Sequence, residues 1–248
     1  MTVSPMVAVI NATPASMQPA TEGLWEGFPE AGHWHLLDDR LVSDADAAGG
    51  MTPALSRRML SLIGHAVTGG ADAVLLSCSM YGPVAALARQ LYEVPVAGSD
   101  EQMFAEVLRR SPDRVVVLGS LESATADSVR RLRATLGQGA RTRVAGVTAP
   151  GAATAASAHD YPALLDALTR AAALHAGTVE MILIGQYSLS PVHGMLADRL
   201  GVPVLSPPLM AARALRAHLL SAHLTTNIAT NIAANGAGDS GDAAGSAS

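Results

Sequence analysis

Cys78, the only cysteine of the chain, is the residue best suited to catalysis. It follows an apolar run at 73–77 and precedes a segment that starts with Pro83, so we expect it between a buried strand and a helix. Backbone amides and the helix dipole at such a position favour a thiolate, which predicts a lowered pKa for Cys78. A thiolate beside a bound carboxylate can act as a base or acid at the α carbon. The alternative of a small, buried apolar cysteine stays open on position alone.

The composition excludes several kinds of cofactor chemistry. All 16 basic side chains of the 248 residues are arginine, so neither a Schiff-base lysine nor the lysine of a phosphate-binding P-loop is present. A single cysteine excludes an intrachain disulfide and a multi-cysteine zinc or iron–sulfur site. No G-x-G-x-x-G follows an expected strand. The sequence therefore predicts neither a cofactor nor a metal site.

The charge balance and the start of the chain bear on partners and location. A net charge of -5 gives no reason to expect nucleic acid, which usually binds a basic face. No stretch approaches 18 unbroken apolar residues, so we expect no membrane span. The first residues lack a basic region followed by a long apolar one, which predicts a cytoplasmic protein without a signal peptide. The expected partner is a small carboxylate substrate, and assembly into a homo-oligomer stays open.

Short runs of Val, Ile and Leu alternate with longer amphipathic segments, a pattern typical of an α/β fold with parallel sheets. We expect strands at 6–11, 34–37, 73–77, 94–97, 114–118, 143–147, 180–184 and 202–205. We expect helices at 53–68, 83–91, 101–110, 123–136, 161–176, 191–200 and 209–219. Thr52 followed by Pro53 predicts a helix N-cap with proline at the first helical position.

The sequence matches itself at one constant offset, which places Val7 on Val115, Pro83 on Pro191, and Pro95 on Pro203. One offset shared by strands and helix starts indicates two pseudo-symmetric, flavodoxin-like lobes. We place one at 1–98 with 207–223 and the other at 99–206. Residues 224–248 are small, polar and Gly-rich, which predicts a disordered tail. A duplicated α/β unit tends to bind its ligand in the cleft between its lobes, where strand carboxyl ends converge.

The offset also identifies residues that should face one another. Cys78 corresponds to Gln186 and Ser79 to Tyr187, and the first strand of each lobe ends in polar residues. We predict that Cys78 transfers a proton, while hydroxyl, amide and backbone N–H groups bind the substrate. The predicted substrate-binding residues are Asn11, Thr13, Ser79, Ser120, Gln186, Tyr187 and Ser188.

Three segments, VAVINATPAS, ADAVLLSCSMYGPV and ILIGQYSLSPVHGMLADRLGVPVLSPP, together resemble the aspartate/glutamate/hydantoin racemase superfamily, which includes arylmalonate decarboxylase and maleate isomerase relatives. The resemblance covers residues 6–220. It implies two lobes, no cofactor, and a cysteine from each lobe, one removing the α proton and the other returning one. Cys78 matches the first cysteine, but the second position holds Gln186, whose amide is neither acid nor base near neutral pH. The implied activity is a cofactor-independent isomerase or racemase acting on a small acid.

Two alternatives stay open. A single-cysteine lyase similar to arylmalonate decarboxylase would release carbon dioxide and protonate the resulting enediolate with one thiol, although that relative keeps its cysteine in the other lobe. A non-catalytic small-acid binding protein would keep the cleft and tolerate loss of Cys78. His193, one turn into the helix after Gln186, is a candidate second proton carrier or an ordinary, partly buried helix residue.

Overall fold

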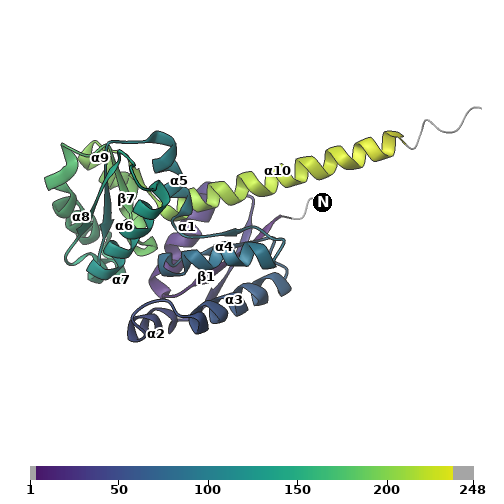
Figure 1. Ribbon diagram of the computed structural model, residues 1–248, viewed down its shortest axis with the longest axis horizontal. Helices are drawn as coiled ribbons and strands as arrows, with labels where there is room; N and C mark the ends of the chain where they lie inside the picture. Colours follow the sequence, from purple (N-terminus) through teal and green to yellow (C-terminus); the bar gives the residue numbers. More distant parts are fainter. Residues whose placement is uncertain (1–3, 237–248) are drawn as a thin grey trace, which may run out of the picture.

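The computed structural model describes residues 4–236 and contains two lobes, each built on a four-stranded parallel sheet (Figure 1). In the first lobe the strand order is β2-β1-β3-β4, with β1 (Met6–Asn11), β2 (Gly32–Leu37), β3 (Ala73–Leu76) and β4 (Val96–Ala97). In the second lobe it is β6-β5-β7-β8, with β5 (Arg114–Gly119), β6 (Arg143–Thr148), β7 (Met181–Ile184) and β8 (Val204–Leu205). The predicted α/β fold with two parallel-sheet lobes is confirmed.

The α-helices are α1 (Met17–Gly27), α2 (Leu41–Ala47), α3 (Pro53–Thr68), α4 (Gly82–Leu91), α5 (Glu101–Arg110), α6 (Glu122–Leu136), α7 (Ala152–Ser157), α8 (Tyr161–Ala176), α9 (His193–Leu200) and α10 (Pro207–Gly236). Short 3₁₀ helices lie at η1 (Pro14–Ser16), η2 (Ser79–Tyr81) and η3 (Tyr187–Val192). Thr52 caps α3 as predicted, because its hydroxyl accepts from the Leu55 amide at 3.2 Å. None of these helices is long and apolar enough to cross a bilayer.

Sequence reasoning missed α1, α2 and α7. The first contains Pro19, Gly23 and Gly27, which disfavour helix, and the other two are single short segments with few large apolar residues. The edge strands β4 and β8 are shorter than expected. Pro95 and Pro203 precede them and have no N–H to donate, although their carbonyls still accept from the neighbouring strand.

The constant offset found in the sequence relates the two sheets in register. Val7 of β1 pairs with Ala73 of β3, while Val115 of β5 pairs with Met181 of β7. The edge strands repeat the correspondence: β3 pairs with β4 through Val74 and Val96, and β7 pairs with β8 through their counterparts, Ile182 and Val204. The internal repeat in the sequence therefore reflects two lobes with the same strand order and the same pairing.

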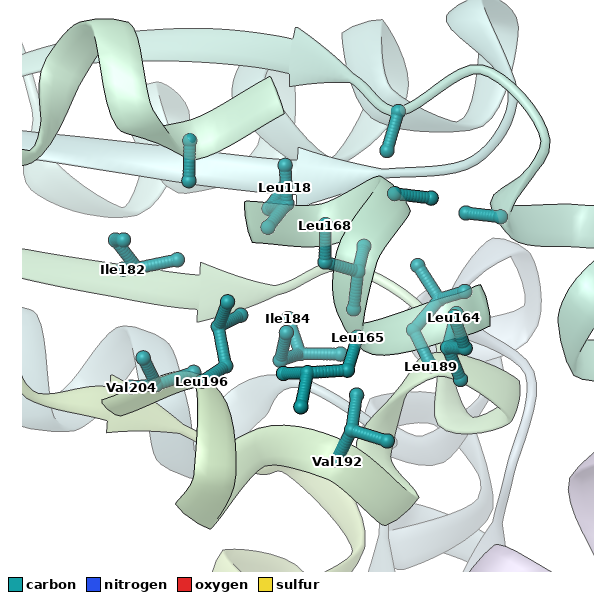
Figure 2. Packing of buried hydrophobic residues seen from close by; sticks show 14 of the residues in the cluster. Leu118, Leu164, Leu165, Leu168, Ile182, Ile184, Leu189, Val192, Leu196 and Val204 are labelled. Atoms are coloured by element: carbon teal, nitrogen blue, oxygen red, sulfur yellow. The ribbon is translucent and has the colours of Figure 1, made fainter. Parts of the chain in front are cut away.

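The central strands β1, β3, β5 and β7 are buried on both faces, which explains their continuous apolar runs, whereas the edge strands β2 and β6 are partly exposed. Along β5, Val116 and Leu118 belong to one core cluster and Val115 and Val117 to another. Figure 2 shows the first of these clusters, where Leu118 and neighbouring strand residues pack against leucines of α8 and α9. The opposite face packs against α5 and α6. The first lobe is layered in the same way, with α3 and α4 on one face of its sheet and α1 and α10 on the other.

The helix α10 returns to the first lobe and packs along α1, then extends away from both lobes (Figure 1). It runs through Gly236, so residues 224–236 are helical, which corrects the prediction that the tail is disordered from residue 224. Extending an existing helix adds one hydrogen bond per ordered residue, and this segment has no proline and no glycine before Gly236. The remainder of the predicted tail, residues 237–248, lies outside the described residues.

We expect Gly23→Ala to destabilise the protein by about 1–3 kcal/mol, because it overpacks the contact between α1 and α10. A Cβ built on Gly23 lies 2.6 Å from Cβ and 2.7 Å from the carbonyl carbon of Pro208. Urea unfolding measures the loss. The matched control is Gly194→Ala in α9, where a Cβ meets nothing within 4 Å and alanine should be neutral or slightly stabilising. Equal effects of the two changes would contradict the close approach.

Candidate active site

Cys78 and Gln186 occupy equivalent turns, one in each lobe. Each is the N-cap of a 3₁₀ helix at the carboxyl end of a central strand, with extended backbone angles. The turns approach the opposite lobe, because η2 contacts α6 while η3 contacts η1 and α1. We call this contact zone the lobe boundary. The structure thus brings the predicted catalytic cysteine and its counterpart to the zone where the two lobes meet.

The environment of Cys78 corrects the expectation of a lowered pKa. Burial raises the pKa of the Cys78 thiol, and the backbone hydrogen bonds of Met80 and Tyr81, which favour the thiolate, offset this only in part. Cys78 keeps some exposure to solvent, but desolvation still has the largest influence on its thiol. Cys78 is therefore a protonated thiol near neutral pH, suited to donating a proton before it can accept one.

Ser120 and Gln186 meet in the second lobe. The Oε1 atom of Gln186 accepts from the backbone N–H of Ser120 at 2.8 Å and from its hydroxyl at 2.7 Å. Both residues are partly exposed. These two bonds direct the amide oxygen of Gln186 toward the end of β5 and fix its orientation, which leaves the Nε2 group as the donor available to a ligand.

Asn11 has a structural role that does not support the predicted substrate contact. Its side chain is fully buried, and its Nδ2 atom lies 3.1 Å from the Val9 carbonyl oxygen and 3.0 Å from Nδ1 of His35. The hydroxyls of Ser16 and Ser77 lie 3.1 and 3.0 Å from its Oδ1 atom. Asn11 therefore ties together β1, the turn after it and the residue before Cys78. Sequence reasoning missed Ser16 and Ser77, although Ser77 precedes the candidate catalytic cysteine directly.

His35 completes this network. Because an amide nitrogen can only donate, Nδ1 of His35 accepts from Asn11, which places the ring proton on Nε2, 2.9 Å from the hydroxyl of Thr21. Burial lowers the pKa of His35, and the neighbouring His33 lowers it further. The network therefore requires neutral His35.

We expect the stability of the protein to fall as the pH drops from about 7 to 5. A lowered folded-state pKa means that the unfolded chain takes up the His35 proton first, so its contribution is complete above the unfolded pKa and is lost toward lower pH. Urea midpoints at both pH values measure the slope. His35→Gln should flatten it, whereas His218→Gln, which replaces an exposed histidine, should leave it unchanged. An unaltered slope in His35→Gln would contradict this assignment.

The other predicted binding residues divide by burial. Thr13, Ser79 and Ser188 are partly exposed beside the turns and remain predicted substrate-binding residues. Tyr187 is buried in the core cluster that α1 and α10 form with the first sheet, and burial raises the pKa of its hydroxyl. This position does not support the predicted substrate contact. His193 is partly exposed, and its Nδ1 atom lies 3.0 Å from the Ser190 carbonyl oxygen, which leaves Nε2 without a protein partner in the described structure.

An ion pair that sequence reasoning missed lies beside the cysteine turn. Nη1 of Arg131, on α6, is 2.5 Å from Oδ2 of Asp100, the N-cap residue of α5. Although Asp100 occupies the N-cap position, its side chain makes no capping hydrogen bond. Burial opposes the charge of Arg131, yet Asp100 and Asp127 outweigh it and raise the pKa of the guanidinium above its ordinary value. The sequence gives one indication that Arg131 is largely buried: it lies three residues after Ser128, which belongs to the buried face of α6.

Two surface cavities of the second lobe lie away from these residues. One, of about 400 Å³, is lined by Leu108, Asp113 and Arg141 among others, and the second adjoins it. Both lie near the amino ends of β5 and β6, opposite the edge where parallel sheets bind ligands. Among the described residues, no cluster of three or more histidine, cysteine or acidic side chains could hold a metal ion.

Comparisons with known proteins identify the family and agree with the fold. The model of the Asp/Glu/Hydantoin racemase family matches residues 42–215. The chain is structurally similar to an allantoin racemase from Klebsiella pneumoniae (17% identity, TM-score 0.67, 88% of this chain and 89% of that one covered). It is also similar to glutamate racemase from Thermus thermophilus in complex with β-chloro-D-alanine (18% identity, TM-score 0.67, 89% of this chain and 82% of that one covered). A third similar structure is unliganded arylmalonate decarboxylase (18% identity, TM-score 0.53, 85% of this chain and 91% of that one covered). No curated protein sequence matches the chain.

Proposed function

Because the chain belongs to the Asp/Glu/hydantoin racemase family, we propose that it is a cofactor-independent isomerase that uses Cys78 to transfer a proton at the carbon α to a carboxylate. The position of Cys78 carries this proposal: its turn lies at the lobe boundary and is the symmetry counterpart of the Gln186 turn. Family membership supports an isomerase-type enzyme. The substrate class, a small acid, is our inference from the polar groups around the two turns.

The reaction needs the minor thiolate form of Cys78, because burial raises the pKa of the thiol: the thiol first loses its proton to solvent, and the thiolate then removes the α proton of the bound acid. The electron pair left on carbon delocalises into the carboxylate and gives an enediolate, whose negative charge needs hydrogen-bond donors. Ser79, Ser188 and the Nε2 group of Gln186 are partly exposed and can supply them. A proton then returns to the same carbon, either from the Cys78 thiol to the original face or from solvent to the opposite face, and only the second route gives the other enantiomer. Neither route needs a redox change or a cofactor.

One observation favours a second candidate, a single-cysteine lyase. Since burial raises the pKa of the Cys78 thiol, the resting residue is a proton donor rather than a base. In a decarboxylation the substrate loses carbon dioxide first, and the thiol is needed only to protonate the resulting enediolate. This alternative requires one thiol and no second acid at Gln186.

Proton NMR of candidate small acids in deuterated water separates the two reactions. Exchange of the α proton with retention of the compound supports the isomerase. Loss of a carboxylate with deuterium at the former α carbon supports the lyase. If neither occurs with acids that bind the protein, the enzymatic proposal is wrong and a binding protein remains.

A further inference from the structure

Arg131 and Asp100 are unusually buried for an ion pair in this protein. Their side chains are 14% and 5% exposed, whereas every other ion-paired arginine of the described structure is at least 36% exposed. Burying a charge costs free energy that the partner only partly recovers, so a buried pair is weak evidence for a stabilising role. The pair therefore needs an explanation in terms of its surroundings.

The Arg131–Asp100 pair lies against the start of α4, the helix that follows Cys78. A Cβ built on Gly82, the first residue of α4, lies 3.6 Å from Oδ1 of Asp100 and 3.8 Å from Nη1 of Arg131. Gly82 also ends the 3₁₀ helix that Cys78 caps, and this helix contacts α6. An ion pair of the second lobe thus packs directly on the catalytic turn of the first.

The guanidinium of Arg131 is held by its own lobe. Its Nε atom donates to Asp127 at 2.8 Å and its Nη2 atom to the Ser128 hydroxyl at 3.3 Å. The guanidinium carbon lies 5.5 Å from the centre of the Phe104 ring, within range of a cation–π interaction. The position of this charge therefore does not depend on Cys78, and Arg131 can act on the thiol as a fixed charge.

We propose that Arg131 is a positioning residue for proton transfer at Cys78: its guanidinium, balanced by the carboxylate of Asp100, sets the ionisation of the thiol across the lobe boundary. The significance of this role rests on the proposed function, but its test needs no substrate. Arg131 favours the thiolate and Asp100 opposes it, so their effects on the pKa of Cys78 have opposite signs. Removing either partner alone should therefore shift the pKa of Cys78, in opposite directions for the two residues.

On the first-lobe side, the groups near the turn are a buried tyrosine and an ion-pair cluster. Tyr81 donates its hydroxyl to the Leu41 carbonyl at 2.9 Å, and burial raises its pKa to about 12. Beyond Tyr81, Arg58 binds Asp38 and Asp44 together. Within the described residues, Arg131 and Asp100 are the second-lobe charges that act on the Cys78 thiol, and Asp127 binds Arg131 from its own helix.

The test is the pH dependence of alkylation by iodoacetamide in the full-length protein, where the single cysteine makes every label a report on Cys78. Arg131→Met should raise the apparent pKa of Cys78 by about one unit, and Asp100→Asn should lower it by a similar amount. Arg131→Lys keeps the charge and should stay near the unmodified protein. The matched control is Arg130→Met, the adjacent arginine, which is 72% exposed and should not change the profile.

Shifts in the same direction for Arg131→Met and Asp100→Asn, or no shift in either, would overturn the proposal and leave a structural pair. If Arg131→Met does not fold, as judged by circular dichroism, Asp100→Asn decides alone, and an unchanged or raised pKa there refutes the idea. The outcome is independent of the proposed reaction. A protein with no isomerase activity can still show the opposite shifts, and an active enzyme can lack them.

Discussion

Replacing Cys78 with serine should lower the rate of α-proton exchange by about a thousandfold or more, with little change in the binding of the acid. A serine hydroxyl is too weak an acid or base to replace the thiol without an activating base, and no histidine bonds to this turn in the described structure. Deuterium incorporation measured by NMR gives the rate, and calorimetric titration with the same acid gives the affinity. Preserved affinity with lost exchange would assign Cys78 to chemistry rather than to binding.

The fold of the variant must be shown to be intact. Serine is close in size to cysteine and the residue is partly exposed, so the urea midpoint should remain near that of the unmodified protein. A variant that exchanges the α proton within tenfold of the original rate would refute the catalytic role. The small-acid binding protein considered from the sequence would then be the better interpretation.

The architecture could be predicted because its signals are local or repeated. Buried parallel strands require continuous apolar runs, which can be recognised in the sequence. The constant offset predicted that both lobes have equivalent strands, and the pairing of these strands is in the same register in both sheets. The errors lie where local signals are weak. The helix α1 contains Gly23 and Gly27, which allow its close contact with α10. This contact is between segments far apart in the sequence, so no local pattern predicts it.

The candidate site was predictable in position but not in detail. The end of each central strand could be located, and the structure places Cys78, Ser120 and Gln186 there, while their roles in catalysis and binding stay predictions. The pKa of Cys78 was predicted in the wrong direction, because the burial of its thiol depends on tertiary packing, including its contact with the core cluster of the first lobe. Asp100 and Arg131 could not be recognised as a pair, since they lie far apart in the sequence and on different helices.

Because Gln186 is neither an acid nor a base, we expect the α proton to exchange with solvent faster than the substrate is converted into the other enantiomer. Cys78 removes the proton from one face, its thiol exchanges with solvent deuterium, and deuteration from that same face returns the original enantiomer. Gln186→Cys would place a second thiol at the equivalent turn and should raise racemisation relative to exchange by about tenfold or more. Optical rotation and NMR exchange in deuterated water give the two rates.

Gln186→Ser is the matched control, because it also removes the amide bonded to Ser120 but adds no thiol. If the serine variant raises racemisation as much as the cysteine variant, the second thiol is not the cause. If the unmodified enzyme racemises as fast as it exchanges, a second proton carrier exists and the one-thiol mechanism is wrong. His193 is then the first residue to replace, since its Nε2 atom has no protein partner in the described structure, whereas burial keeps the hydroxyl of Tyr187 protonated.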